Sequence, residues 1–134
     1  MNREIENAAT KPAPVATATA ATDVLVAAVT TSASAETDVF RGLTGTAPEW
    51  YKLKWDADVA GDKCYVTIGA LNGVGAPDET ATSGAGRALL FESGDSEEFE
   101  FDGNRRALRT KGVAVGSGTG AGMLRIARVG LKHS

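Results

Sequence analysis

The chain has 134 residues, a length that suits one domain. Its formal net charge of −3 gives no overall attraction to nucleic acid or anionic lipid, and its single cysteine permits no internal disulfide. Sixteen glycines, together with many Ala and Thr residues, favour strands and turns over helices.

Residues 1–20, MNREIENAATKPAPVATATA, show no hydrophobic period and contain Pro12 and Pro14. Small residues and prolines bury too little surface to offset the entropy of ordering, so we expect an extended arm or a disordered tail. Residues 21–134 then form a single domain. The apolar run at 24–29 is too short to span a bilayer, and the acidic residues before it argue against a signal peptide.

Short segments separated by turn residues follow the arm. TDVLVAAVTT (22–31) and TDVFRGL (37–43) are β-branched runs, and both predict strands. EWYKLKWDAD (49–58) alternates cleanly, with Tyr51, Leu53 and Trp55 on one face and Trp50 among charged residues on the other. This period of two predicts a strand with one buried side.

The next strands continue this pattern after the turn AGD (60–62). KCYVTIGA (63–70) places Cys64, Val66 and Ile68 on one face, and a long loop, NGVGAPDETATSGAG (72–86), follows. RALLFES (87–93) and EEFEFD (97–102) predict two further strands, the second with Phe99 and Phe101 inward.

A two-residue hairpin loop at Gly103-Asn104 would join this strand to the next one. That register brings together opposite charges on one face and an apolar pair on the other, each pair stabilising by roughly 0.2–1 kcal/mol. The pairs are Asp102 with Arg105, Phe99 with Leu108, and Glu98 with Arg109. The same register also places the apolar Phe101 opposite the charged Arg106, which is its one unfavourable pair.

The last segment, GMLRIARVGLKHS (122–134), fits either a helix or a strand. We favour a strand, because Gly122 and Gly130 bracket the segment. In total about eight short strands, with turn residues every ten or so positions, predict an all-β antiparallel sandwich or jelly roll with an extended N-terminal arm.

The glycine-rich stretch VAVGSGTGAG (113–122) raises the question of a nucleotide site. A dinucleotide fingerprint needs G-x-G-x-x-G before a helix, whereas here the spacing is G-x-G-x-G-x-G and only twelve residues remain. A phosphate-binding P-loop would need Gly-Lys-Ser/Thr, which does not occur. We therefore predict the turn of a β-hairpin.

Residues suited to catalysis or metal binding are few. The single histidine, His133, is one residue from the end, and Cys64 shares the face of Val66 and Ile68. DADVAGD (56–62) lacks two ligands of a calcium loop, and the hairpin register accounts for the carboxylates Glu98 and Asp102. We expect no enzyme activity, no cofactor and no metal.

The basic cluster of Arg105, Arg106, Arg109 and Lys111 lacks interleaved aromatic residues and lies beside an acidic run. Local charge neutralisation is expected there, and no nucleic-acid partner. Trp50 lies on the polar side of its strand, where it is either exposed as an interface anchor or covered by a second sheet or a loop.

A small β domain with an Ala/Thr/Pro arm resembles the cement or decoration proteins of tailed-phage capsids. The resemblance extends over EWYKLKWDADVAGDKCYVTIGA (49–70) and ALRTKGVAVGSGTGAGMLRIARVG (107–130), where a glycine turn joins two short apolar strands. It implies a jelly-roll-like dimer or trimer on the outer capsid surface of a virion, made in the host cytoplasm and bound to the major capsid protein.

With that resemblance, the candidate interface residues come from the arm, from Trp50 and from the basic cluster. They are Pro12, Pro14, Val15, Trp50, Arg105, Arg106 and Arg109. Two other functions stay open. One is a carbohydrate- or ligand-binding β-sandwich with Trp50, Tyr51 or Trp55 as a stacking platform, and the other is a small enzyme or nucleotide binder built on the loop at 116–122.

Overall fold

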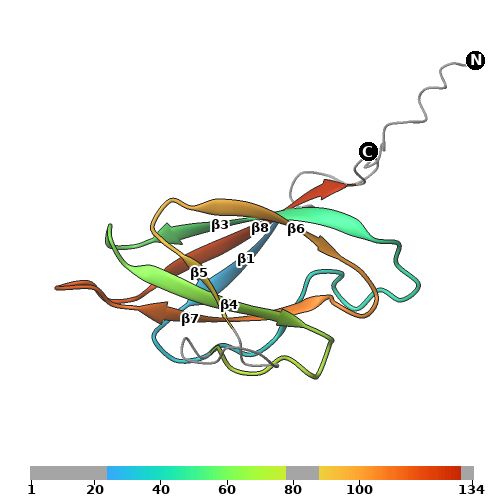
Figure 1. The fold of residues 1–134 in the computed structure, drawn as a ribbon, viewed down its shortest axis with the longest axis horizontal. Helices are drawn as coiled ribbons and strands as arrows, with labels where there is room; N and C mark the ends of the chain where they lie inside the picture. Colours follow the sequence, from blue (N-terminus) through green and yellow to red (C-terminus); the bar gives the residue numbers. More distant parts are fainter. Residues whose placement is uncertain (1–23, 78–87, 131–134) are drawn as a thin grey trace, which may run out of the picture.

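A computed structural model of the protein describes residues 24–77 and 88–130. All elements in these two ranges are strands, and they form two antiparallel sheets packed face to face (Figure 1). The fold is therefore the all-β antiparallel sandwich that the sequence predicts. The strands are β1 (Val24–Val29), β2 (Thr37–Asp38), β3 (Glu49–Ala57), β4 (Lys63–Gly69), β5 (Leu89–Phe91), β6 (Ser96–Phe101), β7 (Ala107–Val113) and β8 (Gly122–Gly130).

The strand order follows a nested pattern. Sheet A has the order β1-β8-β3-β6 and sheet B the order β2-β7-β4-β5. The first strand thus pairs with the last, the second with the seventh, the third with the sixth and the fourth with the fifth. A chain that folds back on itself in this way has the topology of a jelly roll. The predicted arm and its boundary with the domain lie outside the described residues.

The core lies between the sheets and consists of the inward-facing residues of the alternating strands. Tyr51, Leu53 and Trp55 of β3 are at most 2% exposed, as their alternation predicts. Cys64 and Val66 of β4 and Phe101 of β6 are also buried, whereas Ile68 and Phe99 are only partly buried at the margin of the same cluster. The apolar alternation therefore identified the inner faces of three strands correctly.

The ambiguous C-terminal segment is the strand β8, at the centre of sheet A between β1 and β3. Leu124 and Ile126 are completely buried. Arg128 has the same parity but pairs with Glu49, with both contacts between guanidinium nitrogens and carboxylate oxygens at 2.8 Å. A register shift lies beside it, between Trp50 and Tyr51 of β3. A charge at an inward position is thus neutralised at the end of the sheet.

Of the two predicted hairpins, one is correct only at its turn and the other does not form. The pair Asp102 and Arg105 is confirmed, with backbone hydrogen bonds in both directions, so Gly103-Asn104 is the turn. The predicted pairs further along do not form, because β6 belongs to sheet A and β7 to sheet B. Phe99 pairs with Tyr51 and Glu98 with Lys52, whereas Leu108 and Arg109 pair with Ile68 and Thr67 of β4. The glycine loop after β7 likewise crosses from sheet B to sheet A, and is no hairpin turn.

The segment TDVFRGL contains a shorter strand than predicted. Only Thr37 and Asp38 pair with β7. The Asp38 carboxylate then accepts hydrogen bonds from the backbone N–H groups of Phe40 and Gly42, and Arg41 has a positive φ of 54°. Because this side chain satisfies the backbone locally, the chain turns instead of continuing as a strand.

Candidate functional site

The predicted interface residues do not form one surface in the structure. Pro12, Pro14 and Val15 lie outside the described residues. Trp50 is half-buried on the outward side of β3 in sheet A, opposite Glu100 of β6. The three arginines lie in β7 of sheet B or in the connection before it. Trp50 and the arginines are therefore on different sheets.

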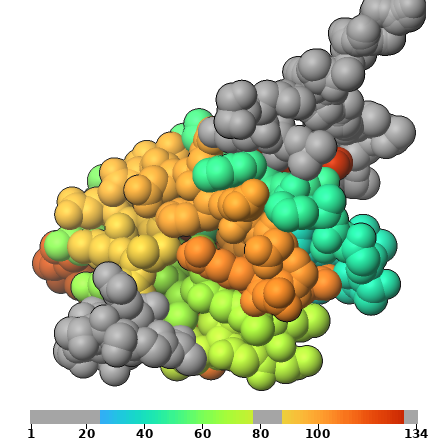
Figure 2. All heavy atoms as spheres, turned by 45° about the vertical axis from the view of Figure 1, so that its right-hand side comes forward, coloured from blue at the N-terminus to red at the C-terminus, as the bar shows by residue number. Residues whose placement is uncertain are grey.

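Arg106 is bound inside the fold. It is 8% exposed, and its Nε and Nη2 donate hydrogen bonds of 2.9 Å to the two carboxylate oxygens of Asp38. Nη2 also donates to the carbonyl of Leu43, and the guanidinium lies 5.3 Å from the centre of the Phe40 ring. In Figure 2 the orange segment around the start of β7 lies between teal residues that follow β2 and yellow-green residues from the region of β4. We therefore drop Arg106 from the candidate interface.

The electrostatics of this pair follow from its contacts. Burial alone raises the pKa of Asp38, but the hydrogen bonds from Arg106 and from the N–H groups of Gly42 and Phe40 outweigh it, so the pKa is lowered. The hydrogen bond to Asp38 raises the pKa of Arg106 in turn. A bidentate pair of this kind fixes both side chains in one geometry. The pair thus fastens the turn after β2 to the start of β7.

The other two arginines differ in exposure. Arg109 is half-buried on β7, and its guanidinium donates to the carbonyl oxygens of Ser34, at 2.7 Å, and Val74, at 3.2 Å. It holds two loops against sheet B. Arg105 lies in the turn after β6 and is exposed. Of the three predicted arginines, only Arg105 has an exposed side chain that a partner can reach.

The glycine-rich loop between β7 and β8 is built around an anion that belongs to the chain itself. The backbone N–H of Val115 donates to Oδ1 of Asp62, and those of Thr119 and Gly120 donate to Oδ2, at 2.7–2.9 Å. Asp62 is completely buried. The loops after β3 and β7 lie at the same end of the sandwich (Figure 1). The N–H groups that a phosphate would need are thus already occupied by a carboxylate.

The Asp62 carboxylate is held in its ionised form. Hydrogen bonds from the N–H groups of Val115, Gly120 and Thr119 lower its pKa, against the effect of burial. The Asp62 carbonyl also accepts a hydrogen bond of 2.9 Å from the indole of Trp55 in the core. Sequence reasoning assigned Asp62 only to a turn. The available signal was a glycine-rich loop with many backbone N–H groups and no acidic residue within its own sequence.

A second acidic side chain organises another loop in the same way. Glu36 accepts backbone hydrogen bonds from Asn72, at 2.6 Å, and Val74, at 2.9 Å. Asn72 has a positive φ of 67°, which the turn after β4 requires. Val74 is buried as a result, and it covers the backbone of Gly69 on sheet B. Two carboxylates distant in sequence from their loops therefore shape both ends of sheet B.

The reactive groups considered from the sequence are placed as follows. Cys64 is completely buried, and burial raises the pKa of its thiol to about 12. The thiolate that a nucleophile needs is therefore scarce near neutral pH. His133 lies outside the described residues. Within residues 24–77 and 88–130, no three His, Cys, Asp or Glu side chains gather in a way that would hold a metal ion.

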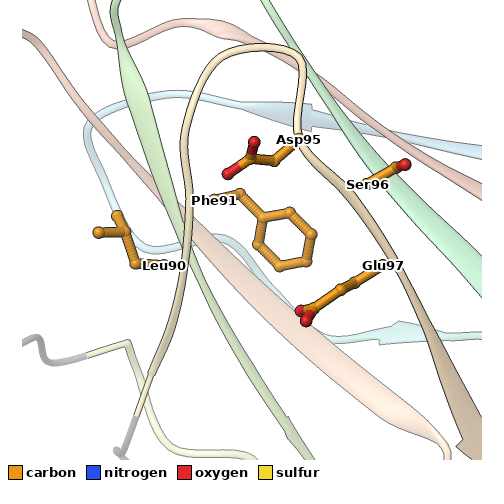
Figure 3. Close-up of a pocket in the computed structure, with 5 residues that line it drawn as sticks. All are labelled: Leu90, Phe91, Asp95, Ser96 and Glu97. Atoms are coloured by element: carbon orange, nitrogen blue, oxygen red, sulfur yellow. The ribbon is translucent and has the colours of Figure 1, made fainter.

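A small pocket of 190 Å³ lies between the edges of the two sheets, at the β5–β6 connection (Figure 3). Figure 3 shows the Phe91 ring at its centre, with the Glu97 carboxylate directed toward the ring. Asp95 accepts a hydrogen bond from the N–H of Glu92, which shapes the connection. The volume is below the roughly 300–1,000 Å³ of typical small-molecule sites. The pocket thus has room for one side chain and is too small for a cofactor.

The three aromatic residues that could form a sugar-binding platform differ in their exposure. Tyr51 is 2% exposed and Trp55 is completely buried. Burial raises the pKa of Tyr51 to about 12, with the neighbouring Glu49 adding to the shift. Trp50 alone of these three has part of its side chain at the surface. A stacking platform of several adjacent rings is therefore not present on β3.

The outward side of sheet A carries an apolar surface that sequence reasoning did not single out. Val26 of β1 is 49% exposed and Met123 of β8 is 43% exposed. Ala28 pairs with Met123, and Val26 with Arg125, so that these side chains share one side of the sheet. The guanidinium of Arg125 binds Asp56 on β3, on the side opposite β1. We call Val26, Ala28 and Met123 the β1–β8 surface.

Comparison with known proteins adds no family to this description: no family model, no curated protein and no solved structure matches the chain. In the part of the chain that the structure describes, no helix is long and apolar enough to cross a membrane. The function is therefore inferred from the fold and from these surfaces.

Proposed function

We propose that this chain is a non-enzymatic structural protein of a phage particle, which binds the outer surface of the capsid and cements neighbouring capsomers. The observation that carries the proposal is that the strand directly after residues 1–23 has an exposed apolar side chain on the outward side of sheet A. Residues 1–23 lead directly into β1, whose Val26 is exposed beside Met123 of β8. In this proposal the predicted arm, which precedes β1 directly in the sequence, and the apolar sheet surface act at the same edge of the domain. Together they offer one extended contact to a large partner.

The architecture supports this proposal by analogy. Jelly rolls with two four-stranded sheets recur among viral capsid proteins, and they also occur in lectins. Many copies on a shell gain from multivalency, because an arm tethered by its own domain has a high effective concentration. An extended arm adds backbone hydrogen bonds where the shell protein has an open sheet edge. The partner in this proposal is the major capsid protein, and the protein acts there as a dimer or trimer.

The first experiment is cosedimentation with capsids of the source phage, with density-gradient fractions quantified by mass spectrometry. We expect stoichiometric copies in the particle band. Removal of residues 1–20 should weaken binding at least tenfold and leave the domain folded. Absence of the full-length chain from the particle band would overturn the proposal.

A matched pair of aromatic substitutions tests the side of the domain that docks. Trp50→Ala alters the outward side of sheet A, whereas Tyr65→Ala alters a half-buried aromatic residue on β4 of sheet B, opposite Leu90 and Lys111. We expect Trp50→Ala to weaken capsid binding and Tyr65→Ala to leave it unchanged. Equal effects would remove Trp50 from the interface.

The carbohydrate-binding alternative rests on Trp50 and is tested separately. A sugar that stacks on an indole changes its fluorescence, and Trp50 is the half-buried one of the two tryptophans. Titration with a panel of sugars should give no change in wild-type fluorescence if the chain is a cement protein. A saturable change that Trp50→Phe abolishes would favour the sugar-binding function instead.

A further inference from the structure

The edges of the two sheets differ in their protection against pairing with another strand. An edge strand presents unpaired backbone N–H and C=O groups, and proteins protect such edges with short strands or charges. β2 has two residues and β5 has three. β6 carries Glu97, Glu98 and Glu100, of which Glu97 is opposite the inward-facing Leu53. Three of the four edges therefore carry a protective feature.

The fourth edge, β1, has none of these features. Its six residues, VLVAAV, include neither a charge nor a proline. Its pairing with β8 runs without a register shift from Val24 opposite Ala127 to Val29 opposite Gly122. β1 ends sheet A, and its second side has no strand beside it within the described residues. It is a regular, uncharged and open edge.

We propose that β1 pairs antiparallel with β1 of a second copy of this chain, so that the two A sheets join into one eight-stranded sheet across a two-fold axis. A two-fold axis makes a strand meet itself in antiparallel orientation, and each copy then satisfies the open backbone groups of the other. The proposed function includes a dimer or trimer, and this inference assigns the contact between its copies to β1, with a test that requires no capsid.

Charge permits a second copy at this edge and opposes one at the other edge of sheet A. Two β1 strands bring no like charges together, because neither strand carries a charge. Two β6 strands, at the opposite edge of sheet A, would place rows of glutamates against each other. The self-pairing of sheet A is thus possible at β1 and opposed at β6.

The N-terminal segment of the same copy is a poorer occupant. It would have to reverse direction immediately before Val24, where the sequence ATATAATD (16–23) contains no Gly, Asn or Pro. Two-residue hairpin turns need a positive φ at a central position, which Gly and Asn adopt most readily, and Pro serves other turns whose φ is negative. A strand from another molecule does not need this turn.

The size of the contact sets the expected strength of the dimer. A pair of six-residue strands buries less than the roughly 1,200–2,000 Å² of a stable interface. We therefore expect a reversible dimer that forms at high protein concentration. Antiparallel pairing keeps outward residues opposite outward residues, so Val26 faces either Val26 or Ala28 of the second copy.

Disulfide cross-linking of the full chain tests this arrangement directly. Val26→Cys and Ala28→Cys variants are mixed in equal amounts and oxidised, which allows both registers to form a bond. The native Cys64 is completely buried and does not compete. The matched control is a mixture of Glu98→Cys and Glu100→Cys on the outward side of β6. We expect the β1 mixture to form covalent dimers at least tenfold faster, and equal rates for the two mixtures would overturn the proposal.

Sedimentation at increasing concentration gives an independent measurement. Wild-type protein should increase in average mass, and Val26→Lys/Ala28→Lys should weaken association at least tenfold, because lysines then face each other in either register. The control Leu43→Lys/Val115→Lys adds the same charge at two other exposed apolar residues and should associate like wild type. A wild-type protein that stays monomeric, or a β1 variant that associates as well as the control, would contradict β1 pairing. Neither result depends on capsid binding, so failure here leaves the cement proposal to its own test.

Discussion

Gly118 lies so close to the Asp62 carboxylate that a Cβ at this position would overlap both carboxylate oxygens. The glycine is thus required by a neighbour and by no unusual backbone angle. Asp62 in turn requires the loop, because the loop N–H groups are its hydrogen-bond donors. The two residues, 56 positions apart in the sequence, define one buried contact between the loops after β3 and β7.

Gly118→Ala should destabilise the protein, because the added methyl group must displace Asp62 from its hydrogen bonds. The matched control is Gly103→Ala, where a Cβ meets nothing within 4 Å. The control should change stability by less than about 0.5 kcal/mol, as surface substitutions usually do. Urea unfolding midpoints of the two variants provide the measurement. Similar midpoints would show that the close contact between Gly118 and Asp62 does not contribute to stability.

The double variant Asp62→Ala/Gly118→Ala tests whether the two residues act together. Removal of the carboxylate creates the space that a methyl group at position 118 needs, so the effects should not add. We expect the double variant to unfold at nearly the same urea concentration as Asp62→Ala alone. Fully additive losses of stability would indicate that the glycine serves another purpose.

Stability should fall in acid because of Asp62 and Asp38. The pKa values of both carboxyl groups are lower in the folded protein than their usual values, so both groups stabilise the fold when ionised. This contribution is complete above the unfolded pKa of about 4 and is lost as the pH falls through the folded pKa. Urea midpoints should therefore be level down to about pH 5 and should decrease below about pH 4. Asp62→Asn should decrease less over the same range than the wild type does.

Neighbouring residues on β8 should differ sharply in their effect on stability. Leu124 is completely buried, whereas Met123 points outward and is 43% exposed. Leu124→Ala should cost about 2–5 kcal/mol because it leaves a cavity, and Met123→Ala should cost less than about 0.5 kcal/mol. Chemical unfolding of both variants checks this difference. Comparable losses would be inconsistent with a strand at this position.

Cys64 should react with thiol reagents only after unfolding. With a pKa of about 12, the native thiol has a thiolate fraction on the order of a thousandfold below that of an exposed cysteine at pH 8. The absorbance released from Ellman's reagent should rise by one equivalent in denaturant and hardly at all in its absence. Rapid labelling of the native protein would mean that β4 opens readily.

The sequence predicted the strands well because alternation reports a local property. Tyr51, Leu53 and Trp55 are buried on the side that their spacing assigns, and Gly103-Asn104 makes its turn with Asp102 opposite Arg105. What lies beyond each turn depends on which sheet the chain joins next. The alternating pattern is the same in either sheet, so the pairing of Phe99 with Tyr51 could not be obtained from it.

The roles of individual charges were harder to predict for the same reason. Arg106 is one of a run of basic residues in the sequence, but its partner Asp38 is 68 positions away. Asp62 belongs to a short turn, and its donors come from a loop more than 50 residues later. Such contacts form only when both sheets are in place. Sequence patterns locate charged residues but do not show which of them are used within the fold.

The nested pairing of the strands also affects how the protein is made. β1 pairs with β8, and Val24 lies opposite Ala127, about 100 residues further along the chain. Non-local contacts of this kind delay folding, since a long loop must close before they contribute. β8 lies between β1 and β3, so β1 cannot join sheet A until β8 has left the ribosome. Each newly made chain therefore passes through a stage in which β1 and β3 both lack β8, and in which chaperones and proteases compete with the closing of the sandwich.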